Sequence, residues 1–416
     1  MGGKMVRPVW ICAATAMIVC AAATGGHAEE VVDQRARRFV FTSPAERIVF
    51  LPMPAPSTYI AIDGTERRIV GMNLGSATAM RDGILGRLFP GMRSIPTDVT
   101  SGAGFMPNIE VILALRPDTV FQWSTAGKDP IEMLDRAGLR TLGIRYGTQE
   151  DMAGYVAMMG LVAGKPERAA EIMRRQRERL DAIAGAMAGL TDHQKPRVLS
   201  LGRTTDRFSA AGAGSYTDFY IQLAGGRNVA ASERLAPGGV TMEQILTWDP
   251  EVVLLGNFDS AMPADLYADP RWQGVAAVRA RRVYRVPLGG YRWDPPNLES
   301  ALTWTWLAGL LQPDRAAFDL RADMRAWYRL LYGHELGDPE IDSILFAAAN
   351  AGSVGYERYG KRCAARPFRS RHVPRLPRRF GRRNSFSSLA WPCCWRQRSS
   401  SRWPSAAMPC RSNASR

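Results

Sequence analysis

The stretch KPERAAEIMRRQRERLDAIAGAMAGL, residues 165–190, decides the fold because it is one long run of strong helix formers. Pro166 stands in its first turn, where a proline needs no amide hydrogen. Apolar residues then recur at helical spacing and form one stripe, namely Ala170, Met173, Leu180, Ile183 and Met187. We therefore expect a single connecting helix over residues 164–190.

On both sides of this helix, short apolar strand-like runs alternate with helical patterns. Before it, we expect strands at 47–51, 69–72, 118–121 and 141–144, with helices at 107–115 and 131–137. After it, we expect strands at 197–201, 252–255 and 282–286, with helices at 216–224 and 242–248. Such alternation implies right-handed crossovers and mostly parallel sheets. The predicted fold class is α/β, with two Rossmann-like lobes (29–163 and 191–346), one long backbone helix between them and a ligand cleft between the lobes. So stiff a connection predicts little motion on binding.

The first 28 residues have the pattern of a secretory signal peptide. Lys4 and Arg7 precede an apolar run over 9–23, and small residues lead to a cleavage site after Ala28. About 15 apolar residues are fewer than the roughly 20 that span a bilayer, which disfavours a transmembrane anchor. Lipid attachment at Cys20 is also disfavoured, because the preceding valine is larger than such sites prefer. We expect a periplasmic protein.

The other end of the chain carries the net charge of +15. Residues 361–416 hold 15 Lys and Arg and no Asp or Glu, so the rest of the chain has 39 basic and 39 acidic residues. A neutral body gives no support for a nucleic-acid partner. We expect 347–416 to be a disordered basic tail, either an arm for nucleic acid or membrane or, our preferred interpretation, sequence read out of frame.

Cysteine and histidine are too scarce for most metal and nucleophile chemistry. Residues 21–362 contain no Cys, and residues 29–360 contain only His193 and His334. A His/Cys metal centre and Cys–His catalysis are therefore excluded from this region. We expect His193 in a solvated loop, Trp304, Trp306 and Trp327 in the core, no resident cofactor and no enzymatic activity.

Several motifs together resemble the helical-backbone substrate-binding proteins of ABC importers for iron–siderophore, haem and cobalamin complexes. They are PNIEVILALRPD (107–118), GKPERA (164–169), LAGG (223–226) and DPRW (269–272), followed by Trp293, Pro296 and Glu299. The resemblance covers about residues 39–346. It implies two lobes, a central helix, a ligand in the cleft and delivery to a membrane permease.

The same resemblance raises a difficulty for docking to that permease. Family members carry a Glu in the first helix of each lobe that pairs with permease arginines, but the matching positions here are Tyr59 and Phe219. Asp218 is the predicted substitute in the second lobe. Its simpler interpretation is an acidic first-turn residue favoured by the helix dipole.

The loops that follow the expected strands are the candidate ligand site, because ligands of open α/β sheets lie beyond the carboxyl ends of strands. Aromatic residues stand there beside arginines and amides, which suits a large anionic chelate with an organic shell. The expected ligand contacts are Trp123, Arg145, Tyr146, Arg203, Phe258, Tyr291, Arg292 and Trp293. Tyr146 and Tyr291 could also ligate haem or ferric iron directly.

The predicted function is a periplasmic receptor that hands a metal chelate, first of all a ferric siderophore, to an ABC-type permease. Cobalamin, haem and a molybdate-type oxyanion remain alternatives, although an oxyanion site needs several donors and no aromatic shell. An exported chelatase-like enzyme is the rival of another class. It would need a His or paired carboxylates in the cleft, where Asp98, Asp206 and Asp259 are isolated acids. We expect a monomer with a small-molecule ligand.

Overall fold

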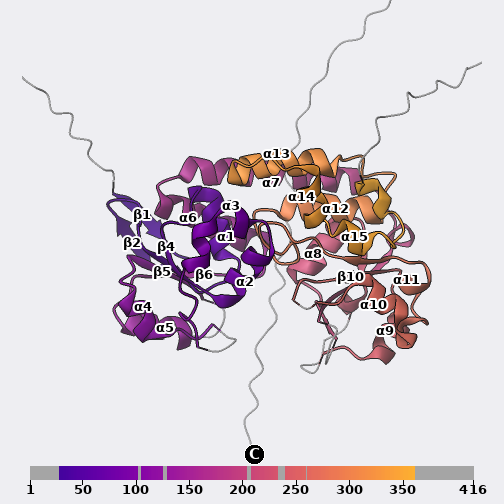
Figure 1. Ribbon diagram of the computed structural model, residues 1–416, viewed down its shortest axis with the longest axis horizontal. Coiled ribbons are helices and arrows are strands. Elements are labelled where there is room, and N and C mark those ends of the chain that lie inside the picture. Colours follow the sequence, from indigo (N-terminus) through magenta and orange to yellow (C-terminus); the bar gives the residue numbers. More distant parts are fainter. Residues whose placement is uncertain are drawn as a thin grey trace, which may run out of the picture. The chain divides into compact units, whose positions relative to one another are not determined.

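The computed structural model describes residues 28–101, 105–124, 129–203, 208–232, 239–258 and 260–360, apart from the side chains of residues 129, 203 and 232 (Figure 1). The predicted signal peptide, Cys20 and the region from Lys361 onward lie outside the described residues. The predictions for Asp206 and Asp259 lie outside them as well.

The N-terminal lobe is built on a four-stranded parallel sheet. Its strand order is β4 (Ile69–Met72), β3 (Ile48–Phe50), β5 (Thr119–Trp123) and β6 (Thr141–Ile144). All four strands are confirmed where the sequence predicts them, because short apolar runs buried on both faces are typical of parallel sheets. The helices of this lobe are α1 (Ala55–Asp63), α2 (Leu74–Asp82), α3 (Leu85–Leu88), η1 (Pro90–Ser94), α4 (Ile109–Ala114), α5 (Asp129–Arg136) and α6 (Gln149–Ala163).

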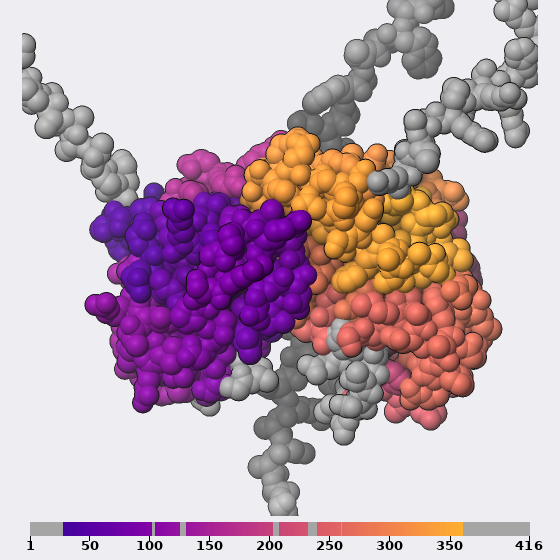
Figure 2. Space-filling view, viewed as in Figure 1, coloured from indigo at the N-terminus to yellow at the C-terminus, as the bar shows by residue number. Residues whose placement is uncertain are grey.

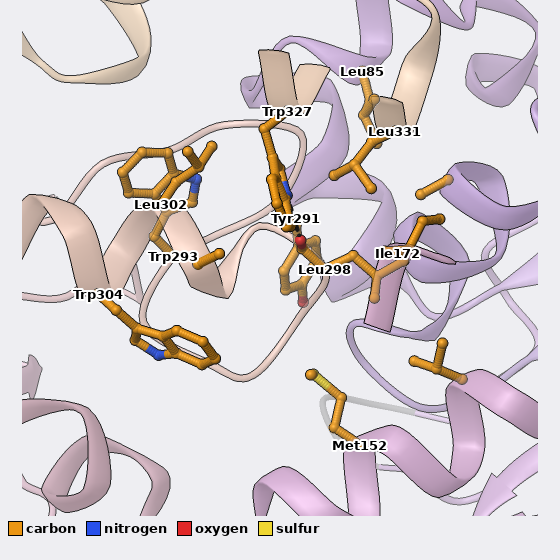
Figure 3. Close-up of a cluster of buried hydrophobic side chains, with 14 of the residues drawn as sticks. Leu85, Met152, Ile172, Tyr291, Trp293, Leu298, Leu302, Trp304, Trp327 and Leu331 are labelled. Atoms are coloured by element: carbon orange, nitrogen blue, oxygen red, sulfur yellow. Dashed lines mark hydrogen bonds between the residues drawn. The ribbon is translucent and has the colours of Figure 1, made fainter. Parts of the chain in front are cut away.

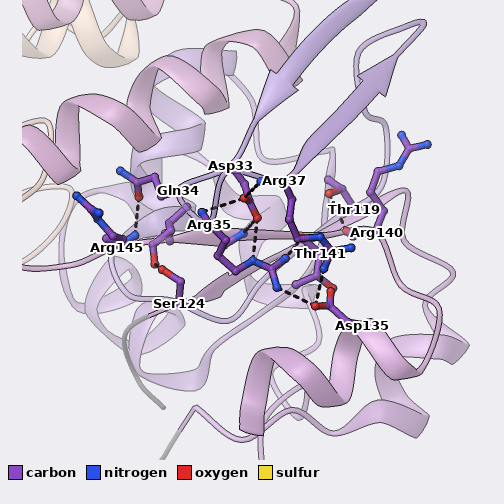
Figure 4. Close-up of polar contacts among 12 residues, drawn as sticks. Asp33, Gln34, Arg35, Arg37, Thr119, Ser124, Asp135, Arg140, Thr141 and Arg145 are labelled. Carbon is purple, nitrogen blue, oxygen red and sulfur yellow. Dashed lines mark hydrogen bonds and ion pairs between the residues drawn. The ribbon is translucent and has the colours of Figure 1, made fainter. Parts of the chain in front are cut away.

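An antiparallel hairpin of β1 (Glu29–Val32) and β2 (Arg38–Phe41) precedes this sheet and was not predicted. Its turn is tied to β6, because the Asp33 carboxylate accepts a hydrogen bond from the Gly143 amide at 2.9 Å. Arg35 donates to Asp33 at 2.9 Å and to Asp135 at 2.7 Å, and these contacts appear together in Figure 4. Polar contacts thus fix the hairpin to the edge of the N-terminal lobe.

The C-terminal lobe contains a second, mostly parallel sheet. Its order is β11 (Val283–Arg285), β10 (Val252–Leu255), β7 (Arg197–Arg203) and β8 (Ser209–Ala210), with β9 (Arg227–Asn228) also paired to β7. Only β8 runs antiparallel. The flanking elements are η2 (Asp192–Gln194), α8 (Tyr216–Leu223), η3 (Val229–Ser232), α9 (Met242–Trp248), α10 (Pro263–Ala268), η4 (Pro270–Trp272) and α11 (Ala276–Arg279). His193 lies exposed in η2, as predicted.

One continuous helix, α7 (Pro166–Met187), connects the lobes and confirms the central prediction. Its 22 residues span about 33 Å. The buried stripe differs from the predicted one at its start, since Ala169 and Ile172 are buried and Ala170 is exposed. Midway along the helix, the buried Gln176 accepts from Gln149 of α6 at 3.0 Å and donates to the Asn297 carbonyl at 3.1 Å. The helix therefore bonds to both lobes at its centre.

A second helix also links the lobes. Arg168 of α7 donates to the carbonyl of Ala61 in α1 and to those of Leu330 and Leu331 in α13 (Leu320–Tyr332). Helix α13 belongs to the C-terminal part of the chain, yet it packs on α1 of the N-terminal lobe (Figure 1). The connection between the lobes is thus stiffer than a single helix would make it.

The three tryptophans predicted for the core are buried between the helices. Helix α12 (Ser300–Leu311) is buried on every side, so Trp304 (Figure 3) and Trp306 lie in the core as predicted. Trp327 of α13 is also buried and donates to the Leu298 carbonyl at 2.7 Å. Among the described residues, no helix combines the length and the apolar character needed to cross a membrane.

The predicted end of the C-terminal lobe at residue 346 is wrong. Two further elements follow α14 (Asp338–Ile344), namely α15 (Ala347–Asn350) and η5 (Tyr356–Tyr359). Tyr356 and Tyr359 are buried, and the Asn350 side chain accepts from the Arg285 amide of β11 at 2.7 Å. Residues 347–360 therefore belong to the folded lobe, because their aromatic and amide groups complete its core.

Candidate functional site

A cavity of about 240 Å³ lies between the two lobes, and we call it the aromatic pocket. Its walls come from both lobes and carry almost no polar groups. The lining residues are Met53, Phe105, Trp123, Tyr146, Phe258, Tyr291 and Pro295. Four of the eight predicted ligand contacts are brought together here.

The strands place these side chains at one edge of each sheet. Trp123 is the last residue of β5, Tyr146 follows β6 by two residues and Phe258 follows β10 by three. This is the carboxyl edge, where ligands of open α/β sheets bind. Trp123 is nearly buried, whereas Tyr146 and Phe258 are 44 % and 42 % exposed. The buried Trp123 ring thus closes one side of the pocket, whereas the rings of Tyr146 and Phe258 are partly exposed to solvent.

Local contacts hold the rings of the N-terminal wall at fixed angles. The Trp123 ring meets Tyr146 edge-on at 5.3 Å between centroids and Phe105 at 6.4 Å. The buried Gln122 side chain donates to the Phe105 carbonyl at 2.8 Å and accepts from the Trp123 amide at 2.8 Å. One amide side chain therefore orients both neighbouring rings.

The loop from Leu288 to Trp293 supplies Tyr291 from the opposite lobe, and the buried carboxylate of Glu299 anchors it. Glu299 accepts from the Gly290 amide at 2.8 Å and from Trp293 Nε1 at 2.7 Å. It also accepts from the hydroxyls of Tyr328 at 2.9 Å and Tyr332 at 2.7 Å. Burial raises the pKa of Glu299. No ion pair of Glu299 occurs within the described part of the chain, so neutral donors alone satisfy it.

Trp293 consequently plays a different role from the predicted one. Its ring is fully buried against the C-terminal core, and its one polar group donates to Glu299 (Figure 3). It does not line the aromatic pocket, so the prediction that it contacts ligand is not supported. Its packing holds the loop that carries Tyr291.

Arg292 lies behind the pocket wall. Its Nε donates to the Asn257 carbonyl at 3.0 Å, and Nη1 donates across the lobes to the Gly75 carbonyl at 3.2 Å. The guanidinium carbon lies 4.7 Å from the centroid of the Phe258 ring. Arg292 therefore supports the pocket ring from behind and lines a separate groove between α2 and the C-terminal lobe.

Arg145 gives the pocket less charge than the sequence suggests. The Arg145 side chain is mostly exposed and donates to Asp151 at 2.8 Å, while its amide bonds to Gln34 (Figure 4). Arg203 ends β7, and its side chain lies outside the described residues. Among the described arginines, none lines the aromatic pocket.

The lobes also touch beside the pocket. The Ile84 amide donates to the Gly289 carbonyl at 3.0 Å, and a Cβ on Gly83 would lie 2.2 Å from the same oxygen. Arg87 of α3 pairs with Glu340 of α14. Figure 2 shows the purple surface that includes α2 and α3 meeting the orange surface of the C-terminal helices. Contacts this close leave little freedom at the back of the cleft.

A second cavity of about 190 Å³ adjoins the aromatic pocket and shares Tyr146, Phe258 and Pro295 with it. Its remaining lining mixes small or apolar residues with the polar side chains of Ser200, Ser209, Thr217 and Asp294. Sequence reasoning missed Asp294, because a single acid beside Trp293 carries no motif. It also missed Pro295, whereas Met53 and Phe105 lie in loops that the sequence pointed to.

The tyrosines of the site remain protonated at neutral pH. Burial raises the pKa of Tyr291 to about 12, and burial together with the Asp294 charge raises the pKa of Tyr146. Their neutral phenols can donate and accept hydrogen bonds. Within the described ranges, no group of three or more His, Cys, Asp or Glu side chains could hold a metal ion.

Asp218, the predicted docking residue, is not presented at the surface. The Asp218 side chain is buried and accepts from Gly214, Gln222 and Asn228, at 3.1, 3.0 and 3.2 Å. Tyr59 is fully buried against Phe50, and Phe219 packs beside Trp304. Docking through Asp218 is therefore not supported, because its carboxylate stabilises the start of α8.

The chain is similar to known proteins, and these similarities agree with the geometry of the site. The family model described as "Periplasmic binding protein" matches residues 81–288, half of the chain. A periplasmic solute binding protein of Veillonella parvula is 30 % identical; the match covers 78 % of this chain and 98 % of that one, with a TM-score of 0.71.

Two curated relatives are more distant. The Molybdate-binding protein MolA of Haemophilus influenzae is 24 % identical over 73 % of this chain and 90 % of its own length. A Vitamin B12-binding protein of Yersinia pestis is 26 % identical over 37 % of this chain and 54 % of its own. The family match, the Veillonella structure and the cross-lobe pocket agree. This chain belongs to the periplasmic binding proteins of ABC importers.

Proposed function

We propose that this protein binds an organic metal chelate in the aromatic pocket and delivers it to an ABC-type permease, with ferric siderophores as the first ligand class. The single observation that carries the proposal is the lining of the pocket. Five aromatic rings, a methionine and a proline from two lobes face one cavity. Such a surface suits the organic shell of a chelate, because ring faces bury apolar area.

The size of the pocket limits how the ligand is held. A cavity of about 240 Å³ is smaller than the roughly 300–1,000 Å³ typical of ligand sites. A large chelate would therefore place one face in the pocket and extend past the exposed rings of Tyr146 and Phe258. Cobalamin, whose receptor is among the relatives, would bind in the same way.

A molybdate-type oxyanion is the second candidate, and the relationship to MolA favours it. The pocket chemistry argues the other way. A small oxyanion is held by several convergent donors, but the pocket lining is apolar and the neighbouring cavity contains the Asp294 carboxylate. We therefore rank the chelate first.

Transport, not catalysis, is the activity that the family supports, since its members are solute-binding proteins. The periplasm is the corresponding location. The predicted chelatase alternative gains no support from the site, whose described lining residues offer no histidine and a single carboxylate.

Titration of the full-length protein against a ferric trihydroxamate, a ferric tricatecholate, haem, cyanocobalamin and molybdate tests the proposal. We expect saturable binding of one chelate and a loss of at least tenfold in affinity in Tyr146→Ala. Binding of molybdate alone would contradict the proposal, and so would binding of no probe.

A further inference from the structure

The cavity of about 190 Å³ beside the aromatic pocket is lined in part by a carboxylate of which the described fold uses only one oxygen. Asp294 lines this cavity together with the hydroxyl side chains of Ser200, Ser209 and Thr217. The cavity shares Tyr146, Phe258 and Pro295 with the aromatic pocket, so a ligand in one has direct access to the other. A cavity that contains hydroxyl and carboxylate side chains therefore adjoins the apolar aromatic pocket.

The two oxygens of Asp294 are in different situations. Oδ2 accepts from the Asn257 amide at 3.3 Å. Oδ1 is buried and has no hydrogen-bond partner among the described residues. Glycine at 256 permits this placement, because a Cβ there would lie 3.0 Å from Oδ2 and 3.0 Å from the Leu201 carbonyl. The absence of a side chain at Gly256 thus leaves room for the Asp294 carboxylate, whose Oδ1 has no partner among the described residues.

Among the described residues, Arg292 forms no ion pair with Asp294. Arg292 is next but one in sequence, but its described bonds go to the carbonyls of Asn257 and Gly75 and to the Tyr291 hydroxyl. No ion pair of Asp294 occurs within the described ranges. Burial raises the pKa of Asp294. An unpaired buried carboxylate is costly, and native structures rarely keep one without a reason.

We propose that this cavity is a polar subsite in which Asp294 binds an N–H donor of the ligand, an amide or an ammonium group, while the aromatic pocket receives the apolar body of the ligand. The inference rests on the proposed function and restricts the class of chelate that the protein binds. The ligand is a neutral or cationic chelate that bears N–H groups, and a polyanionic chelate or an oxyanion is disfavoured by the carboxylate.

The binding test compares wild type with Asp294→Asn. The probes are cyanocobalamin, which bears primary amides, a ferric trihydroxamate with a free ammonium group, and a trianionic ferric tricatecholate. We expect a donor-bearing probe to bind wild type most tightly. Asp294→Asn should weaken binding of that probe tenfold or more, since hydrogen bonds to a charged group are the stronger ones. The exposed Asp192→Asn should leave its affinity unchanged.

The outcomes separate this inference from the proposed function. If the tricatecholate binds most tightly, or if Asp294→Asn binds the donor-bearing probe as wild type does, the subsite is wrong while the chelate proposal stands. If no chelate binds, the proposed function itself fails.

A measurement without ligand tests the same carboxylate. If Oδ1 has no partner, unliganded Asp294→Asn should melt about 2 °C higher than wild type at pH 7, because an amide loses less on burial than a carboxylate. A lower melting temperature would show that the carboxylate stabilises the fold and would overturn the inference.

Discussion

Two buried carboxylates lie five residues apart in the C-terminal lobe and differ in how they are satisfied. Glu299 accepts four hydrogen bonds, from Gly290, Trp293, Tyr328 and Tyr332. Asp294 accepts one, and its second oxygen has no partner among the described residues. Burial raises the pKa of both groups.

The difference between Glu299 and Asp294 distinguishes a structural carboxylate from one that is available to a ligand. A carboxylate whose acceptors are all used holds a loop in place, whereas one with a free oxygen at a cavity remains available to a ligand. On this basis Glu299 is a positioning residue for Tyr291, and Asp294 belongs to the binding site. The predictions below test that division, beginning with the largest effect.

Loss of Glu299 should cost the most stability. Glu299→Ala leaves four buried donors without an acceptor, so we expect the free energy of unfolding to fall by about 4 kcal/mol. Tyr332→Phe removes one of the donors and should cost about 1 kcal/mol. Urea unfolding followed by circular dichroism measures both. A loss below 1 kcal/mol in Glu299→Ala would show that the carboxylate is not an anchor.

Tyr146 should matter for binding and little for folding. Its side chain is 44 % exposed and forms one wall of the pocket. We expect Tyr146→Ala to lower chelate affinity about 10–100-fold, with a stability change below about 1 kcal/mol. Leu246→Ala, at an exposed apolar residue of α9, is the matched control and should leave affinity unchanged. Equal losses in both variants would argue for a nonspecific effect.

The stability of Asp294→Asn relative to wild type should depend on pH. The folded-state pKa of Asp294 is raised, so wild type carries the cost of a buried charge above this pKa and loses that cost as pH falls through it. We expect the advantage of the variant, about 1 kcal/mol at pH 7, to shrink as the pH drops towards the unfolded value of about 3.9. Beyond burial, the charge of Asp294 contributes to the raised pKa of Tyr146, Tyr220 and Tyr291, and the charge of Arg292 opposes the rise in the pKa of Asp294. Melting curves from pH 7 to pH 4 provide the check, and a constant difference would exclude titration of Asp294.

The two arginines predicted to touch ligand should differ. Arg292 supports the Phe258 ring from behind, so Arg292→Ala should weaken chelate binding about fivefold. Arg145 points its guanidinium at Asp151 and should change affinity less than about twofold when replaced by Ala. Isothermal titration calorimetry distinguishes them, and a larger loss for Arg145→Ala would restore it as a direct ligand contact.

The fold was largely predictable because its signals are local. Each core strand of the two sheets is a short apolar run, and α7 combines an N-terminal proline with a helical stripe, so period and propensity suffice. The β1–β2 hairpin was missed because polar contacts of Asp33 and Arg35 hold it. Helix α12 was missed because it is buried on all sides and shows no periodicity.

The site was predictable only in part. The rule that ligands lie at the carboxyl ends of strands located the loops that supply Trp123, Tyr146 and Phe258. It could not say which neighbour in a loop faces the cavity. Tyr291 lines the pocket and Trp293 faces the core, because Glu299 binds the indole, and that contact depends on tertiary structure.

Tryptophan fluorescence tests most directly whether the ligand binds at the aromatic pocket. Trp123 lines this pocket, while Trp272 lies in the core of the C-terminal lobe. We predict that the bound chelate quenches wild-type emission, that Trp123→Phe loses a large share of this quenching and that Trp272→Phe retains it. Unchanged quenching in Trp123→Phe, at unchanged affinity, would contradict the account.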